Sequence, residues 1–170
     1  MSKPKNLKSR KEELIERLGV YKENEEQLAP LAARILATLI LTGRKGVTFE
    51  GLVTDLKASK STICTHLNTL QASGRVSYFT KPGDRKRYFI VSPNHLIQIM
   101  DEMMEKWSAQ KQIHQDILDY KTAANQEIDQ EEESKFDLEF HKDYLEFLGE
   151  AGKSIKKLKE KIINKHLQDE

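Results

Sequence analysis

The sequence predicts a mainly α-helical chain that carries one small β-hairpin, and three observations favour this fold class. Apolar residues recur at three- and four-residue steps over most of the chain, as they do on one face of an α-helix. Strand-forming residues gather in one place, residues 75–92, around the turn signal Lys81-Pro82-Gly83-Asp84. A hydroxyl-rich helix comes immediately before this hairpin. That order of elements indicates a winged helix-turn-helix joined to further helices.

Two helices are expected before the hydroxyl-rich region. Residues 6–20 have leucines at helical spacing and a glycine near the end, and residues 21–27 read as a polar connector. Pro30 suits the first turn of a second helix, which is expected to stop at Gly43. Because this second helix is apolar nearly all round, it should lie at the centre of its domain.

The next two helices begin with recognisable capping residues. Thr48, between Val47 and Phe49, is the expected N-cap of a short helix. Ser59 is the expected N-cap of the hydroxyl-rich helix, residues 59–73, which Gly74 closes. At about 100° per residue this helix has two faces. Its apolar face holds Ile63, Leu67 and Leu70, and its polar side holds Ser61, Thr62, Thr65, Asn68 and Thr69.

Long helices are expected after the hairpin. Pro93 opens the first of them, and an acidic linker, residues 127–133, ends it. A second helix then carries an aromatic stripe, and Gly149 and Gly152 are expected to loosen its end. The stripe consists of Phe136, Phe140, Tyr144 and Phe147. A last helix is expected over residues 153–166, with Ile155, Leu158 and Ile162 turned inward.

Composition limits the class of protein. The chain has 170 residues, of which 32% are charged and 38% hydrophobic, so we expect a soluble protein of one or two small domains. No apolar run approaches the roughly 20 residues that span a bilayer, and no signal peptide is recognisable. A single cysteine, Cys64, excludes an intrachain disulfide and a cysteine-based zinc site. A cytoplasmic location is the expectation.

The charges are unevenly distributed along the chain. Residues 42–92 contain nine Lys or Arg against three Asp or Glu, whereas residues 93–151 contain five against fifteen. A basic block beside an acidic one indicates that only the first block contacts phosphate.

The basic block contains the residue types that bind double-stranded DNA. Short hydroxyl and amide side chains on a helix can reach base edges in the major groove, and cations on a wing can reach the backbone. No long arginine points from the middle of the helix, so modest direct readout with a contribution from DNA shape is expected. The candidate DNA-binding residues are Lys60, Ser61, Thr62, Thr65, His66, Asn68, Lys81, Arg85, Lys86 and Arg87.

Residues 31–91 resemble the MarR superfamily of bacterial winged-helix regulators, and within it the GbsR-type branch. The likeness lies in SKSTICTHLNTLQASGRV, residues 59–76, and in KPGDRKRYFIV, residues 81–91. It implies a homodimer held by helices at both chain ends, acting as a repressor that a small molecule relieves. It places the DNA contacts at Lys60, Ser61, Thr62, Thr65, Arg85 and Lys86. Residues 64–68 depart from the GbsR-type pattern, so the resemblance implies no shared operator or effector.

Other kinds of site have little support in the sequence. The five histidines form no pair at i, i+3 or i+4, which argues against a metal-binding helix. Cys64 reads as a small half-buried filler, with a redox switch as the alternative. No nucleophile with a base and no glycine-rich phosphate loop is present, so we expect neither an enzyme nor a cofactor. An effector, if one binds, is placed at Met100, Met104 and Trp107, where the acidic block favours a small cationic or amphipathic ligand.

The sequence therefore predicts a dimeric, ligand-responsive repressor. Residues 22–92 would form the DNA-binding domain, and residues 1–21 and 93–170 a helical dimerisation region. The seam between two chains is placed on the apolar stripes Leu7–Leu18 and Ile155–Ile162. The alternative is a winged helix that serves as a protein–protein interaction module within a larger complex.

Overall fold

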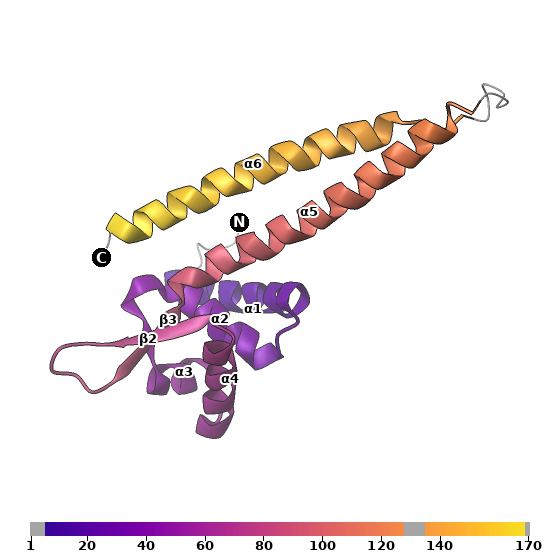
Figure 1. Cartoon of the computed structure of the whole chain (residues 1–170). Helices are drawn as coiled ribbons and strands as arrows, with labels where there is room; N and C mark the ends of the chain where they lie inside the picture. The colour runs from indigo at the N-terminus through magenta and orange to yellow at the C-terminus, as the bar shows by residue number, and fades with distance from the viewer. Residues whose placement is uncertain (1–5, 128–134, 169–170) are drawn as a thin grey trace. The chain divides into compact units, whose positions relative to one another are not determined.

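The computed structural model describes residues 6–127 and 135–168, which form two compact units that divide between His95 and Leu96. Most of the chain is helical and only one small sheet is present in the part described, which confirms the predicted fold class (Figure 1). The first unit contains α1 (Leu7–Glu26), α2 (Pro30–Thr42), η1 (Gly43–Lys45), β1 (Val47–Thr48), α3 (Phe49–Leu56), α4 (Lys60–Ala72), β2 (Val76–Thr80) and β3 (Arg87–Val91). α5 (Pro93–Ala124) begins in this unit and continues into the second, which also contains α6 (Glu139–Gln168).

The predicted helix caps are present in the first unit. Pro30 occupies the first turn of α2, and Gly43 ends that helix. The Thr48 hydroxyl accepts a hydrogen bond from the Gly51 amide at 3.1 Å, and the Ser59 hydroxyl accepts one from the Thr62 amide at 3.2 Å. Each cap satisfies one of the amides that a helix leaves unpaired at its first turn. The caps fix where α3 and α4 begin.

The hydrophobic core of the first unit surrounds α2, as its all-round apolar sequence predicts. Ile35, Leu36 and Leu39 on α2 are at most 1% exposed. Residues from two helices and two strands complete the buried cluster: Leu52 from α3, Ile63, Leu67 and Leu70 from α4, Val76 from β2 and Phe89 from β3. The apolar face of α4 is therefore held inward, and its polar face is left outside.

The sheet has three antiparallel strands in the order β1-β3-β2, one more than the sequence predicted. Val47 pairs with Phe89, and on the other side of β3 Tyr78 pairs with Phe89. β1 is only two residues long, too short to show an alternating pattern. Gly46 lets the chain reach β3, because its φ is +69° and a Cβ there would lie 3.0 Å from the Tyr88 Cβ.

Two expected helix ends are wrong. α1 continues to Glu26 through the segment expected to be a connector, whose lysine and glutamates are good helix formers. Within it, Lys22 and Glu26 form an i, i+4 ion pair of 2.6 Å, and Gln27 ends the helix with a φ of 50°. α6 also runs unbroken through Gly149 and Gly152, so the two helices expected there are one. Of the acidic linker, residues 128–133 lie outside the described residues.

The second unit pairs α5 with α6. Met100 on α5 and Leu148 on α6 are buried, and Lys159 on α6 forms an ion pair with Asp101 on α5. These contacts oppose the roughly 1 kcal/mol that each interior glycine costs a helix. Much of the aromatic stripe is nevertheless exposed, with Phe140 62% and Phe147 59% accessible. None of the described helices combines the length and the apolar character that a membrane span requires.

Candidate nucleic-acid interface

The outer face of α4 carries an uninterrupted set of small polar side chains. Lys60, Ser61, Thr62, Thr65 and Asn68 are all exposed, and His66 is half-buried. The Thr65 hydroxyl donates to the Ser61 carbonyl at 3.0 Å, which leaves its oxygen lone pairs available as acceptors. The helix thus presents both donors and acceptors at the short reach that major-groove base edges require.

The wing is the β2–β3 hairpin, and a single acidic residue shapes its loop. The Asp84 carboxylate accepts hydrogen bonds from the Lys86 amide at 2.9 Å and from the Tyr88 hydroxyl at 2.7 Å. The bond from the Lys86 amide, followed by that from Tyr88, lowers the pKa of Asp84 below its ordinary value. The bond to Asp84 raises the pKa of Tyr88. Asp84 therefore stays ionised and holds the loop just before the two cations at the wing tip, Arg85 and Lys86.

The cations of the wing fall into two groups. The Lys81 ammonium lies 3.8 Å from the centre of the Tyr88 ring, and the Arg87 guanidinium lies 4.4 Å from that of Tyr78. Such cation–π contacts fix a charged group over the sheet. All four cations are exposed, and Arg85 and Lys86 lie between the two ring-bound ones at the loop. The tip pair is thus the part of the wing best placed to reach a phosphate.

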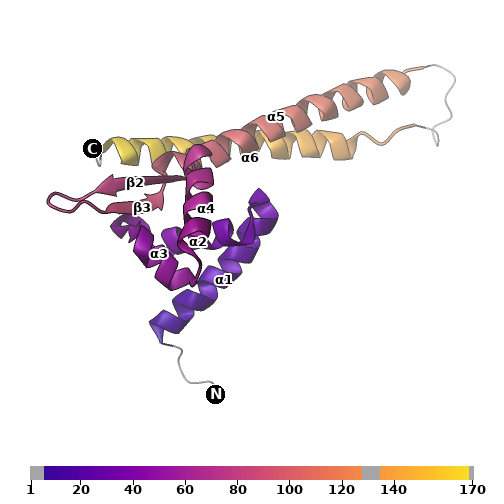
Figure 2. The same cartoon turned by 90° about the horizontal axis from the view of Figure 1, so that it is seen from below.

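A groove of about 470 Å³ joins α4 to the wing. Its walls come from α3, α4 and the wing, and Figure 2 shows the wing projecting away from these helices. The lining residues are Phe49, Glu50, Cys64, Leu67, Asn68, Gln71, Arg85, Lys86, Arg87 and Phe89. The fold therefore brings Asn68 of the helix to one surface with Arg85, Lys86 and Arg87 of the wing, which are distant from it in sequence.

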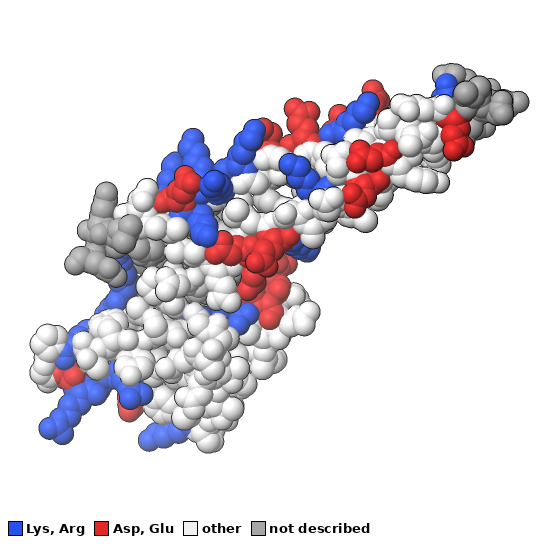
Figure 3. Space-filling model, viewed as in Figure 1, with Lys and Arg blue, Asp and Glu red and all other residues white. Residues whose placement is uncertain are grey.

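The charge on this surface is mainly positive. Figure 3 shows basic side chains gathered around the wing, with few acidic ones among them. Glu50 is the acidic residue that lines the groove, and Cys64 lies exposed beside Asn68, whose amide is 3.7 Å from the Cys64 sulfur. The expected half-buried position of Cys64 is therefore wrong. The thiol is exposed because it lies on the flank of α4 that the groove leaves open.

A second hollow, of about 310 Å³, lies between α5 and α6 within the second unit. Two of the three residues proposed for an effector, Met104 and Trp107, line it, whereas Met100 is buried and is not among its lining residues. The other lining residues are Ser108, Lys111, Leu148, Gly149, Gly152, Lys153 and Lys156. The three lysines give this hollow a local charge opposite to that of the acidic block as a whole.

A histidine pair in the second unit was not foreseen. His114 on α5 and His141 on α6 meet with their Nδ1 atoms 3.0 Å apart, and the Lys121 ammonium lies 3.1 Å from His141 Nε2. Burial, then the charges of Lys121 and His114, lower the pKa of His141, so it is neutral at pH 7. Because an ammonium only donates, Nε2 accepts and the His141 proton lies on Nδ1, toward His114. The described residues contain no cluster of three or more metal-ligating side chains.

Sequence comparison finds one regulator among proteins of established function. The chain is 34% identical over 82 residues to the HTH-type transcriptional regulator MmpR5 of Mycobacterium tuberculosis (strain ATCC 25618 / H37Rv). The match covers 48% of this chain and 49% of MmpR5, so the chain spans about half the length of the curated relative that it matches. No protein-family model matches the chain.

Solved structures with a related arrangement also belong to regulators. A crystal structure of a transcriptional regulator matches 91% of this chain and 99% of its own with 22% identity and a TM-score of 0.48. A point mutant of S. aureus MepR, bound to an oligodeoxyribonucleotide, matches 61% of this chain and 80% of its own with 15% identity and a TM-score of 0.41. Both scores are low, so the winged-helix assignment rests on the helices, strands and register of this chain itself.

Proposed function

We propose that this chain is a DNA-binding transcriptional regulator that reads DNA with α4 and the β2–β3 wing. The observation that carries the proposal is the groove that joins Asn68 on the polar face of α4 to Arg85 and Lys86 on the wing. The partial likeness to MmpR5, a helix-turn-helix regulator, supports it. Repression, and membership of the GbsR-type branch, are inferences from the sequence resemblance.

The first test concerns sequence preference. Thr65→Ala removes one hydroxyl from the exposed face of α4 and should alter preference at one base pair, at a cost of about 1–3 kcal/mol there. Sites selected from a random DNA pool by both proteins measure the change. Thr54→Ala is the control, because the Thr54 hydroxyl makes the same bond to a carbonyl four residues back, but on α3.

Titrations of DNA at several salt concentrations separate DNA binding from the alternative function. A DNA-binding protein loses affinity steeply as salt rises, because bound phosphates release counterions. A winged helix that serves only as a protein interaction module would show no salt-dependent shift of DNA. Identical selected sites for Thr65→Ala and the parent protein would remove α4 from the reading of bases.

We further propose that two copies bind one near-palindromic site. One winged helix makes few contacts, and two-fold dimers are the common solution. The proposed seam is partly uncovered in a single chain, where Leu7 is 81% and Leu158 48% exposed. Half-sites should lie roughly 10 bp apart. Sedimentation at micromolar concentration should show a dimer, and a stable monomer would exclude this assembly.

An effector is proposed at the hollow lined by Met104 and Trp107. Methionine and tryptophan side chains suit an adaptable apolar wall, and Lys111, Lys153 and Lys156 favour an amphipathic ligand with an acidic rather than a basic group. Trp107 is the only tryptophan, so its emission reports on this place alone. Decanoate should change that emission and decyltrimethylammonium should not. A ligand that releases DNA without changing Trp107 emission would place the effector site elsewhere.

A further inference from the structure

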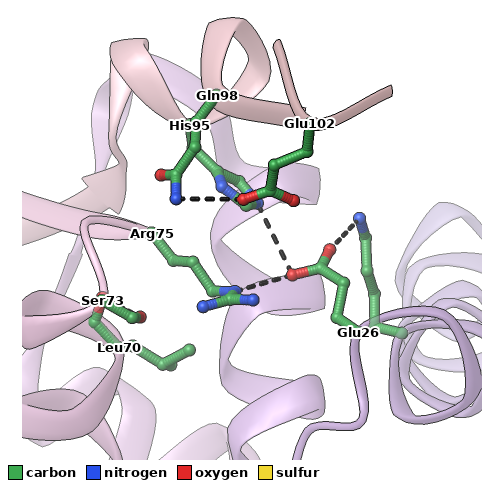
Figure 4. Close-up of polar contacts among 8 residues, drawn as sticks. Glu26, Leu70, Ser73, Arg75, His95, Gln98 and Glu102 are labelled. Atoms are coloured by element: carbon green, nitrogen blue, oxygen red, sulfur yellow. Dashed lines mark hydrogen bonds and ion pairs between the residues drawn. The ribbon is translucent and has the colours of Figure 1, made fainter. Parts of the chain in front are cut away.

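A single carboxylate joins three elements of the first unit (Figure 4). Glu26, the last residue of α1, accepts a hydrogen bond from Arg75 Nε at 2.7 Å and one from the Lys22 ammonium at 2.6 Å. The His95 Nε2 atom, in the first turn of α5, lies 3.7 Å from the same carboxylate oxygen that Arg75 contacts. The Glu26 side chain is only 12% exposed. The end of α1, the segment after α4 and the start of α5 therefore meet at one partly buried charge.

Arg75 lies at the corner between α4 and the wing. Gly74, with a φ of 72°, turns the chain out of α4, and the Arg75 amide donates to the Leu70 carbonyl at 2.9 Å. The Arg75 carbonyl accepts from the Ser92 amide, also at 2.9 Å, where the wing ends. Both DNA-facing elements thus leave the body of the unit beside one residue, and Glu26 holds the side chain of that residue.

The balance of charges makes Glu26 difficult to replace. Burial raises the pKa of Glu26, but the hydrogen bonds from Arg75 and Lys22 and the charges of Lys22 and His95 together lower it below its ordinary value. Glu26 is therefore ionised at neutral pH. Without its charge, Arg75 and Lys22 would face each other in a partly buried place with no anion between them, which is costly.

We propose that Glu26 is a positioning residue for DNA binding, which fixes the α4–wing corner against α1 and the first turn of α5 through Arg75 and His95. The proposal rests on the DNA-binding function proposed above. It follows that a displacement of the end of α1 or of the start of α5 moves α4 and the wing together. A shift at this corner is thus a route by which events elsewhere in the chain change DNA affinity.

The test replaces one charge without changing the size of the side chain. Glu26→Gln should weaken DNA binding on the order of ten-fold at a temperature where the protein is fully folded, because the corner loses its anchor. Glu23→Gln is the matched control: Glu23 lies on the same helix and pairs with Arg34 of α2, away from the corner. The control should lower the melting temperature but leave the DNA affinity of the folded protein within two-fold, roughly the error of such comparisons.

A second measurement follows the corner without DNA. Hydrogen exchange at the Arg75 and Ser92 amides reports the two bonds that define the corner, and Glu26→Gln should speed both more than Glu23→Gln does. In a double-mutant cycle, Arg75→Met should cost little further affinity once Glu26 is Gln. Equal loss of affinity in the two glutamine variants, or unchanged exchange at the two amides, would overturn the positioning role. If the parent protein binds no DNA, the proposed DNA-binding function is contradicted instead. Hydrogen exchange at the two amides then still shows whether Glu26 holds the corner.

Discussion

Replacing both wing-tip cations, Arg85→Ala with Lys86→Ala, is expected to weaken DNA binding at every sequence alike. Both side chains are exposed at the loop, whereas Lys81 and Arg87 pack on tyrosine rings. Contacts to phosphate carry no sequence information, so their loss lowers specific and non-specific affinity together. Each lost phosphate contact should reduce the slope of log affinity against log salt by about 0.9, or roughly 1.8 for the pair.

Titrations at four or five salt concentrations, on one preferred site and one unrelated duplex, measure both effects. Lys106→Ala with Lys142→Ala is the control, because these exposed lysines lie on α5 and α6 outside the proposed seam and their removal changes the net charge equally. The control should keep the parent salt slope. A wing variant with the same slope as this control would show that the tip does not contact phosphate.

The largest effect on stability is expected from Leu36→Ala. Leu36 lies on α2 at the centre of the core and is 0% exposed, so truncation leaves a cavity among the buried residues of the core. Such substitutions cost about 2–5 kcal/mol. Urea unfolding followed by circular dichroism, at one fixed protein concentration, measures the loss.

Ile40→Ala supplies the comparison on the same helix, because Ile40 is 39% exposed and its truncation removes few contacts. We expect a loss for Ile40→Ala several times smaller than that for Leu36→Ala. Equal losses would mean that α2 does not lie at the centre of a packed core. DNA affinity measured well below the transition should stay near that of the parent protein in both variants.

Local sequence predicted those parts of the fold that local interactions determine. Ser59 and Thr48 cap their helices with their own hydroxyls, and the spacing of Ile63, Leu67 and Leu70 decides which face of α4 is buried. These caps and this spacing predict α3 and α4, and the turn Lys81-Pro82-Gly83-Asp84 predicts the wing. β1 was not predicted, because two residues have no alternating pattern of their own. They form a strand only through their pairing with β3.

Contacts between distant residues had no local signal. Glu26 and Arg75 are 49 positions apart, and His114 and His141 are 27 apart. Spacing within a helix shows which side chains share a face, but not which helix comes to lie against that face. The candidate DNA-binding residues were named from chemical type, yet which of the wing cations lie over a tyrosine ring depends on the register of β2 with β3.

The exposed aromatic side chains of α6 would make copy number a thermodynamic variable if the proposed dimer buries them. Phe140 and Phe147 remain about 60% accessible in one chain, so α5 and α6 alone leave much of their apolar surface in water. If the proposed dimer also covers this surface, the second chain would bind only the folded form, and mass action would then raise the melting temperature with protein concentration. Such a dimer would be less stable at low copy number, so the cell's supply of the protein would set its lifetime as well as its proposed occupancy of DNA.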